Sequence, residues 1–152
     1  MNETIIPVDH KKNGPIVDNQ INAMLVQALP PGVRLTAIFD SCHSGSALDL
    51  PYRYDCEDMA CHVKKEGGGR GQKDVVMFAG SKDHQKSMDT KIAGEATGAC
   101  SFAFIDAVSK SGEVSYGQLL TMIRDTLKKA GFTQHVQVST GFKLDMNAPF
   151  HF

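Results

Sequence analysis

The sequence lacks an excess of charge of one sign and lacks a long apolar run. Its 152 residues include 16 Lys and Arg against 17 Asp and Glu, so the net charge is −1. This balance excludes the strongly basic surface with which proteins bind nucleic acid or anionic membranes. No apolar segment is long enough to span a membrane, and the first residues lack the basic and apolar regions of a secretory signal. We therefore expect a protein of the cytoplasm or nucleus that binds neither nucleic acid nor membranes.

Cysteine is also scarce, with four residues in the chain: Cys42, Cys56, Cys61 and Cys100. In a reducing compartment such side chains remain thiols, which favours catalysis or metal binding over a disulfide scaffold. The remaining composition, 41% hydrophobic and 22% charged, is typical of one globular domain, and we assign residues 1–152 to it.

Apolar periodicity in the first half predicts a helix followed by buried strands. A helix is expected over residues 16–29, with Asp18 as its cap and the Pro-Pro-Gly sequence at 30–32 as its end. Apolar runs at 34–39 and 74–80 predict two strands that present their following loops at the same edge of a sheet. Residues 51–73 lack periodicity and end in a basic, glycine-rich run, so we expect an exposed loop there.

The second half predicts two helices and a strand. Helical spacing covers residues 99–108, and Ser115 is expected to cap a further helix that Gly131 closes. Residues 136–140 predict a third strand, and the tail is expected to dock through Phe150 and Phe152. The pattern as a whole predicts an α/β domain.

The run Leu35 to Ser44 places an acid, a cysteine and a histidine at the carboxyl end of a buried strand, where ligands bind in open α/β sheets. Cys42 is the leading candidate for a nucleophile, although a lone cysteine at a strand end is more often a small buried residue. Asp40 and Cys42 share one face of an extended chain, whereas His43 faces the other way. His43 is therefore a poor general base for Cys42.

Residues 40–45, with the sequence DSCHSG, resemble the nucleophile motif of the metacaspases, and residues 46–52 continue the match in the style of the fungal members. Further segments that look like metacaspase sequence are residues 6–9 (IPVD), 14–18 (GPIVD), 79–83 (AGSKD), 97–99 (TGA) and 115–120 (SYGQLL). The resemblance implies a caspase-like sheet flanked by helices. It also implies a cysteine endopeptidase that cleaves polypeptides after Arg or Lys, with residues 51–73 between p20-like and p10-like parts.

The same resemblance implies roles for two residues of the motif. Cys42 would be the nucleophile, and Asp40 would be the acid of the S1 pocket that pairs with a basic P1 side chain. The family's catalytic histidine lies in a Ser-Gly-His-Gly turn, which does not occur in this sequence. The chain thus resembles the C-terminal part of the domain, without the N-terminal strands, the second S1 acid or the oxyanion glycine. We expect negligible peptidase activity from it alone.

Calcium is the cofactor that the resemblance implies. Two of the family's four carboxylate positions match Asp18 and Asp49, and the other two align with Asn2 and Asn19. Calcium prefers hard oxygen ligands, and each change from carboxylate to amide removes a negative charge. We therefore expect a weakened site.

Two other interpretations remain open at this stage. Cys56, Cys61 and His62, with Cys42 or His43, would supply four zinc ligands, but their spacing does not match an ordinary zinc knuckle. The chain would otherwise be a non-catalytic, metacaspase-like remnant that acts through protein–protein interaction, by pairing with an intact homologue or with itself. An open, hydrophobic edge on the strand at 34–39 would favour such self-association.

Overall fold

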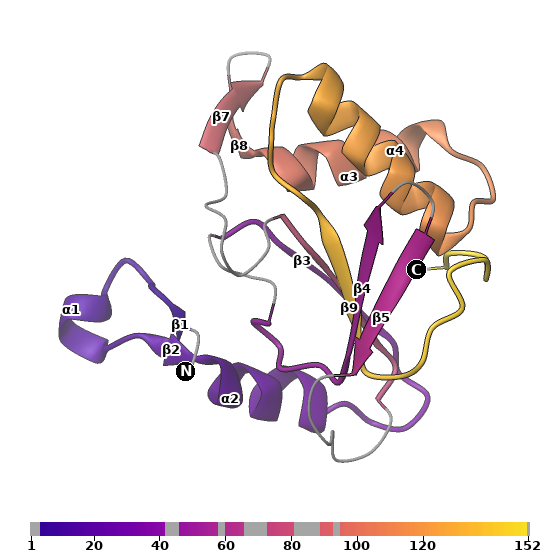
Figure 1. The fold of residues 1–152 in the computed structure, drawn as a ribbon. Coiled ribbons are helices and arrows are strands. Elements are labelled where there is room, and N and C mark those ends of the chain that lie inside the picture. The colour runs from indigo at the N-terminus through magenta and orange to yellow at the C-terminus, as the bar shows by residue number, and fades with distance from the viewer. Residues whose placement is uncertain are drawn as a thin grey trace.

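The computed structural model describes residues 4–41, 46–57, 60–65, 73–80, 89–92 and 95–151. Side chains are described in these ranges except at 55–57, 60–65, 89–92 and 95–97. A five-stranded sheet lies at the centre, in the order β3-β6-β9-β4-β5 (Figure 1). Its strands are β3 (Leu35–Phe39), β6 (Val75–Ala79), β9 (Gln137–Thr140), β4 (Tyr52–Glu57) and β5 (Ala60–Lys65). Only β3 and β6 are parallel among the pairs of this sheet, so the expected α/β fold with a helix-flanked sheet is confirmed as a mixed one.

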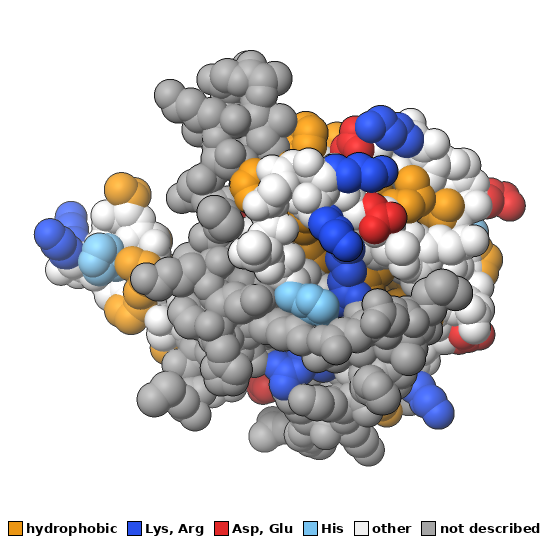
Figure 2. All heavy atoms as spheres, turned by 45° about the horizontal axis from the view of Figure 1, so that its top comes forward, with side chains coloured by type: hydrophobic (Ala, Val, Ile, Leu, Met, Phe, Trp, Pro, Cys, Tyr) orange, Lys and Arg blue, Asp and Glu red, His pale blue; other side chains and the backbone are white. Residues whose placement is uncertain are grey.

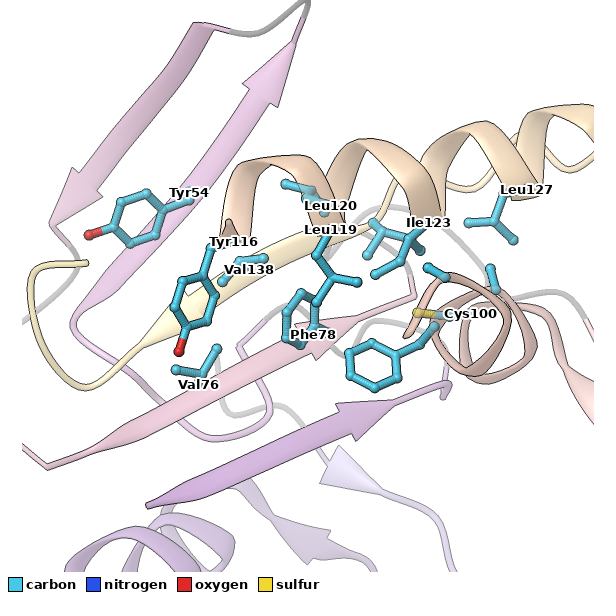
Figure 3. Packing of buried hydrophobic residues seen from close by; sticks show 14 of the residues in the cluster. Tyr54, Val76, Phe78, Cys100, Tyr116, Leu119, Leu120, Ile123, Leu127 and Val138 are labelled. Atoms are coloured by element: carbon cyan, nitrogen blue, oxygen red, sulfur yellow. The ribbon is translucent and has the colours of Figure 1, made fainter. Parts of the chain in front are cut away.

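Strand β6 separates the two hydrophobic cores. All five of its residues are buried, as its uninterrupted apolar run predicts for a strand covered on both faces. Val76 and Phe78 belong to the larger core, with α3 (Ala99–Lys110) and α4 (Tyr116–Lys129) (Figure 3). Its other three residues belong to the second core on the opposite face.

Helices α3 and α4 confirm the predictions for 99–108 and for a helix capped by Ser115. The Gln118 N–H donates to the Ser115 hydroxyl at 3.2 Å, and the Ser115 N–H donates to the Gln118 side chain at 2.8 Å. This reciprocal capping box satisfies two backbone groups at the helix start. Gly131 follows the helix with a φ of 83°, a left-handed conformation that glycine adopts readily. None of the helices that the structure describes is long and apolar enough to cross a membrane.

The opposite face of the sheet is covered by α2 (Asp18–Ile21) and the π-helix η1 (Asn22–Gln27) that continues it. Ile21 and Val26 are buried against the second core, which accounts for the helical spacing in the sequence. The predicted helix over residues 16–29 was wrong at its first two positions, because Ile16–Val17 forms β2, which pairs with β1 (Thr4–Ile5). Asp18 is consequently the first helical residue, and Val17 occupies the cap position. A short α1 (His10–Asn13) lies between β1 and β2.

The expected loop over 51–73 is wrong for most of its length, because β4 and β5 form an antiparallel hairpin there. Residues 66–72 lie outside the described part of the chain. The strand β4 pairs with β9, and Tyr54 is only 1% exposed. The Leu144 N–H donates to the Tyr54 hydroxyl at 2.6 Å. These contacts come from residues far along the chain, so local periodicity does not report them. A further hairpin, β7 (Asp89–Ile92) and β8 (Glu95–Gly98), was likewise not predicted.

The C-terminal tail docks on the larger core through Phe150, as expected. Its ring meets those of Phe78, Phe104 and Tyr116 edge to face, with centroids 5.3 to 6.2 Å apart. Such geometry is the favoured one for aromatic pairs. Phe152 lies outside the described residues.

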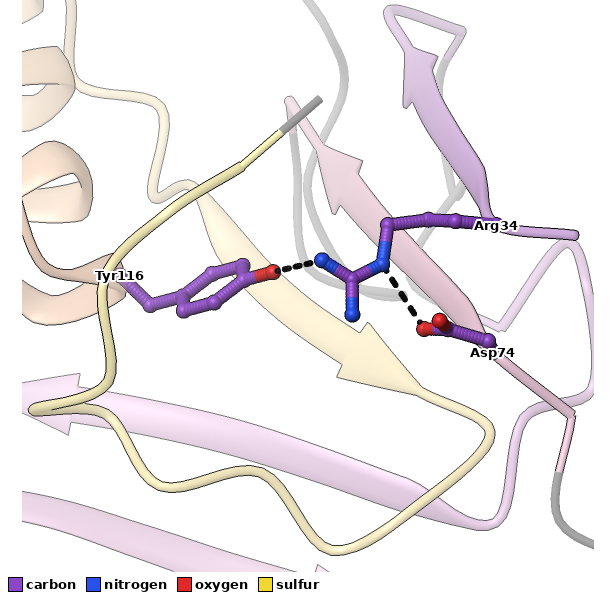
Figure 4. A network of polar contacts seen from close by, with 3 residues as sticks. All are labelled: Arg34, Asp74 and Tyr116. Carbon is purple, nitrogen blue, oxygen red and sulfur yellow. Dashed lines mark hydrogen bonds and ion pairs between the residues drawn. The ribbon is translucent and has the colours of Figure 1, made fainter. Parts of the chain in front are cut away.

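A polar network ties together the starts of β3, β6 and α4 (Figure 4). The Arg34 Nε lies 2.9 Å from the Asp74 carboxylate, and Arg34 Nη1 donates to the Tyr116 hydroxyl at 3.5 Å. The hydrogen bond to Asp74 raises the pKa of Arg34, and burial raises the pKa of Tyr116. Because the Arg34 and Asp74 side chains are each about a third exposed, solvent screens the pair and it contributes little to stability.

The substitution Tyr54→Phe tests the contribution of the β4 anchor. It leaves the buried Leu144 N–H without its acceptor, and we expect the free energy of unfolding to fall by about 1–3 kcal/mol. Urea denaturation measures this change. Tyr52→Phe, which removes the hydroxyl of a half-buried tyrosine in the same strand, is the matched control and should cost less than about 0.5 kcal/mol. Equal losses in the two variants would contradict the assignment.

Candidate active site

The carboxyl ends of β3 and β6 meet at one edge of the sheet. The parallel register runs from Leu35 opposite Val75 to Phe39 opposite Ala79, and the Gly80 N–H donates to the Phe39 carbonyl at 2.8 Å. The prediction that both strands present their loops at the same edge is thereby confirmed. Asp40 follows β3 directly at this edge.

The carboxylate of Asp40 contacts the N-terminus of α3. The Cys100 N–H donates to Oδ1 at 3.3 Å, and the Ser101 N–H donates to Oδ2 at 2.8 Å. These are backbone donors of the first helical turn, which have no partner within the helix, and the helix dipole favours a negative charge there. Asp40 therefore joins the end of β3 to a helix that begins about sixty residues later.

Two glycines make room for this carboxylate. A Cβ atom on Gly80 would lie 2.8 Å from Asp40 Oδ1 and equally close to the Cys100 Cβ, and one on Gly98 would overlap the Asp40 carboxylate. Neither glycine has a left-handed conformation, so close packing is the reason that a side chain is not accommodated. Both glycines lie in segments of the family resemblance, Gly80 in AGSKD and Gly98 in TGA, but local sequence did not indicate that either faces Asp40.

Cys100 is the cysteine whose side chain the structure describes at this edge. Cys100 is fully buried, and burial together with the Asp40 charge raises the pKa of its thiol to about 12. A thiol with so high a pKa is a poor nucleophile, because the thiolate is the reactive form. The two oxygens of Asp40 accept N–H groups of Cys100 and Ser101, and the carboxylate can attract a cationic group.

The predicted nucleophile Cys42, with residues 43–45, lies outside the described part of the chain. The segments on both sides are anchored. Asp40 is held by α3 on one side, and Leu48 is fully buried on the other, where the Asp49 N–H closes a turn onto the Ser46 carbonyl at 2.8 Å. Cys42 follows the anchored Asp40 by two residues.

Of the four residues expected to bind calcium, Asn2 lies outside the described ranges. Asn22 Nδ2 donates to the Leu48 carbonyl at 2.6 Å, which ties the helix that Asp18 begins to the turn that contains Asp49. The carboxylate oxygens of Asp18 and Asp49 are the kind of ligand that calcium prefers. The Asp18 carboxylate, however, also accepts the N–H of Asn19 at 2.7 Å. Within the described ranges, no group of three His, Cys, Asp or Glu residues could hold a metal ion.

The other proposed ligands are placed only in part. The side chains of Cys56, Cys61 and His62, proposed for zinc, lie outside the described side chains, as does residue 43. Two histidines make local contacts: His10 Nδ1 lies 3.0 Å from the Pro7 carbonyl, and His135 Nε2 lies 2.9 Å from Arg124 Nη2.

The substitution Gly98→Ala tests the packing of the Asp40 carboxylate. The added methyl group would displace that carboxylate from α3, and we expect the free energy of unfolding to fall by about 1–3 kcal/mol. Gly112→Ala is the control, since a Cβ there meets nothing within 4 Å, and its effect should stay within about 0.5 kcal/mol. Thermal or urea denaturation of both variants measures the difference. A Gly98 variant as stable as the Gly112 variant would contradict the close packing.

Comparison with known proteins identifies relatives of this chain. A family model described as the metacaspase, peptidase C14 domain matches residues 1–51. Metacaspase-1A of Aspergillus clavatus is 42% identical over 189 aligned positions, which cover 95% of this chain and 44% of the relative. Metacaspase-1 of Emericella nidulans is 41% identical, with 95% and 46% covered, and Metacaspase-1B of Neurospora crassa is 41% identical, with 97% and 45% covered.

The chain is shorter than the relatives that it matches. The chain spans about half the length of the curated relatives that it matches. The aligned positions outnumber the 152 residues of the chain, so the relatives contain additional residues within the matched region. The matches nevertheless cover nearly the whole chain, so this chain is similar over nearly all of its length to part of the fungal metacaspases, and the matching family model is that of the peptidase C14 domain.

Proposed function

We propose that this chain contains the nucleophile-bearing part of a cysteine endopeptidase that cleaves polypeptides after Arg or Lys. The observation that supports this proposal most directly is the position of Asp40, whose carboxylate is fixed at the carboxyl end of β3 two residues before Cys42. A fixed carboxylate beside a nucleophile provides a charged partner for a basic P1 side chain.

Asp40 would bind the substrate through the negative charge of its carboxylate. The two N–H groups of α3 hold the carboxylate in one orientation, and a guanidinium or ammonium group would be attracted to its charge. Cys42 would then attack the carbonyl carbon of the P1 residue and form a thioester as the amine leaves. Both the attack and the departure of the amine require a proton acceptor and donor.

The histidine that serves this purpose in the family motif has no counterpart in this sequence, which contains no Ser-Gly-His-Gly turn. Without a base for Cys42, only binding contributes to rate acceleration. Loss of one member of a catalytic unit lowers turnover by roughly a millionfold in a well-studied protease. We therefore propose that the chain alone is an inactive fragment of the enzyme.

The direct test is turnover of fluorogenic peptides with Arg or Lys at P1, with calcium present. We expect rates no higher than those of the Cys42→Ala variant, and Asp at P1 supplies the specificity control. A cooperative melt of the same preparation establishes that the protein is folded. Robust turnover that depends on Cys42 would overturn the proposal of an inactive fragment.

Labelling by a basic-P1 electrophile tests the assignment of Cys42 and Asp40 separately from turnover. We expect slow modification of Cys42 that is faster with Lys or Arg at P1 than with Asp at P1, and Asp40→Asn should reduce this preference. Equal labelling with basic and acidic P1 groups would contradict the role of Asp40.

We also propose calcium as a ligand of weak affinity, held by Asp18 and Asp49 with amide oxygens from Asn2 and Asn19. The support is the donor chemistry and the hydrogen bond that joins the two elements concerned. Isothermal titration with calcium should show weak binding that Asp49→Asn abolishes and that Asp125→Asn, at an exposed site on α4, leaves unchanged. No binding heat from the unmodified protein would refute this proposal.

A second candidate function is that of a non-catalytic partner that associates with copies of itself or with an intact relative. The position of β3 at the edge of the sheet favours it.

The buried thiol of Cys100 is compatible with the reducing cytoplasm or nucleus in which we propose that the protein resides.

A further inference from the structure

Apolar and polar side chains lie in unusual places at two points of the described chain. On the projecting segment of β1, α1 and β2, apolar side chains lie at the surface (Figure 2), and Val8 is fully exposed. In strand β9 the reverse holds, because Gln137, Ser139 and Thr140 are all buried. Exposed apolar side chains are common in proteins, whereas buried polar groups are nearly always hydrogen-bonded. The three polar side chains of β9 therefore need partners inside the protein.

The two faces of the sheet give these side chains different surroundings. Thr140 lies on the side of the larger core, where its hydroxyl donates to a backbone carbonyl. Gln137 and Ser139 lie on the other side, because they pair with Ala79 and Met77 of the second core. Two polar side chains of β9 thus face a core that is otherwise apolar.

The carboxamide of Gln137 is the group whose hydrogen bonding is incomplete. The residue is only 2% exposed, and within the described part of the chain its Nε2 has no hydrogen-bond partner. A buried donor without a partner destabilises a fold, so such donors are nearly always bonded to protein or to ordered water. A carboxamide nitrogen offers two N–H donors. We therefore expect a further bonding group beside this side chain.

We propose that one buried water molecule binds between Gln137 and Ser139. Residues two apart on a strand share a face at a separation of about 6.8 Å, and two hydrogen bonds through one water span about 5.7 Å. The water accepts a hydrogen bond from Gln137 Nε2 and donates one to the Ser139 hydroxyl oxygen, which has two lone pairs. Because Ser139 is 3% exposed, both partners lie away from bulk solvent.

The surroundings favour water over an ion. Ala79 and Met77, which lie beside the two polar residues, are apolar and fully buried, and a charged ligand would lose its hydration there. Arg53, opposite Ser139 on β4, already interacts with another group, so it does not require an anion at this place. The site accordingly takes a small neutral molecule that both donates and accepts hydrogen bonds, as water does.

The water site lies near the edge that carries the candidate active site. Gln137 is the first residue of β9 and lies opposite Ala79, the last residue of β6. Gly80 follows directly and makes the close approach to Asp40. The water therefore belongs to the interior next to this edge, and its binding does not depend on peptidase activity.

Urea denaturation of Gln137→Met tests whether the amide has a partner. Methionine has a similar length and no amide, so removal of an unpaired donor should raise the folding equilibrium constant by roughly tenfold. Because we propose that water pairs this amide, we expect the constant to stay equal or to fall. Gln27→Met, at an exposed residue, is the matched control and should change the constant by less than about threefold. A tenfold rise specific to Gln137→Met would overturn the inference.

Nuclear magnetic resonance of the unmodified full chain tests for the water directly and does not depend on the folding of a variant. With isotope-labelled glutamine, the Gln137 amide protons should give NOE and ROE cross peaks to water of opposite sign, which distinguish a long-lived water from proton exchange. The amide of Gln27, which is exposed, is the control and should not give this pair of peaks. A Gln137 amide without these peaks, or one bonded to a protein group instead, would contradict the proposal.

Discussion

The contact between the Asp40 carboxylate and the first turn of α3 is the constraint on which the candidate site depends. Two backbone N–H groups of α3 donate to this one side chain, which follows β3 and precedes the proposed nucleophile. The helix is in turn part of the larger core, and the glycines at 80 and 98 are required for the approach. The orientation of the proposed P1 acid is therefore set by the fold, because moving the carboxylate would disturb a helix terminus.

Local sequence predicts those helices and strands whose regularly spaced apolar residues also make the buried contacts. The run at 75–79 is buried on both faces, and the helices at 99–110 and 116–129 place most of their periodic residues in one core, although Ile105 is 62% exposed. The β4–β5 hairpin was missed because β4 is a strand only through its pairing with β9 and the contact of Tyr54 with Leu144, about ninety residues away. Propensity and pattern do not encode such a partner.

The candidate site shows the same division. The motif around Cys42 indicated where the chemistry lies, and the parallel pairing of β3 and β6 was expected from two apolar runs with polar ends. The capping of α3 by Asp40 was not expected, because a carboxylate from a distant strand leaves no signal in the helix sequence. Gly98 carried the only available signal, a small residue immediately before an apolar helix.

The order of strands in the sheet differs from their order along the chain. The last strand, β9, lies inside the sheet, between β6 and the earlier β4, and β6 separates β9 from β3. A break in the backbone anywhere between β5 and β6 would therefore leave two pieces that share one sheet and two cores. The pieces would remain together as a non-covalent complex, so a cut chain would retain the architecture of an intact one.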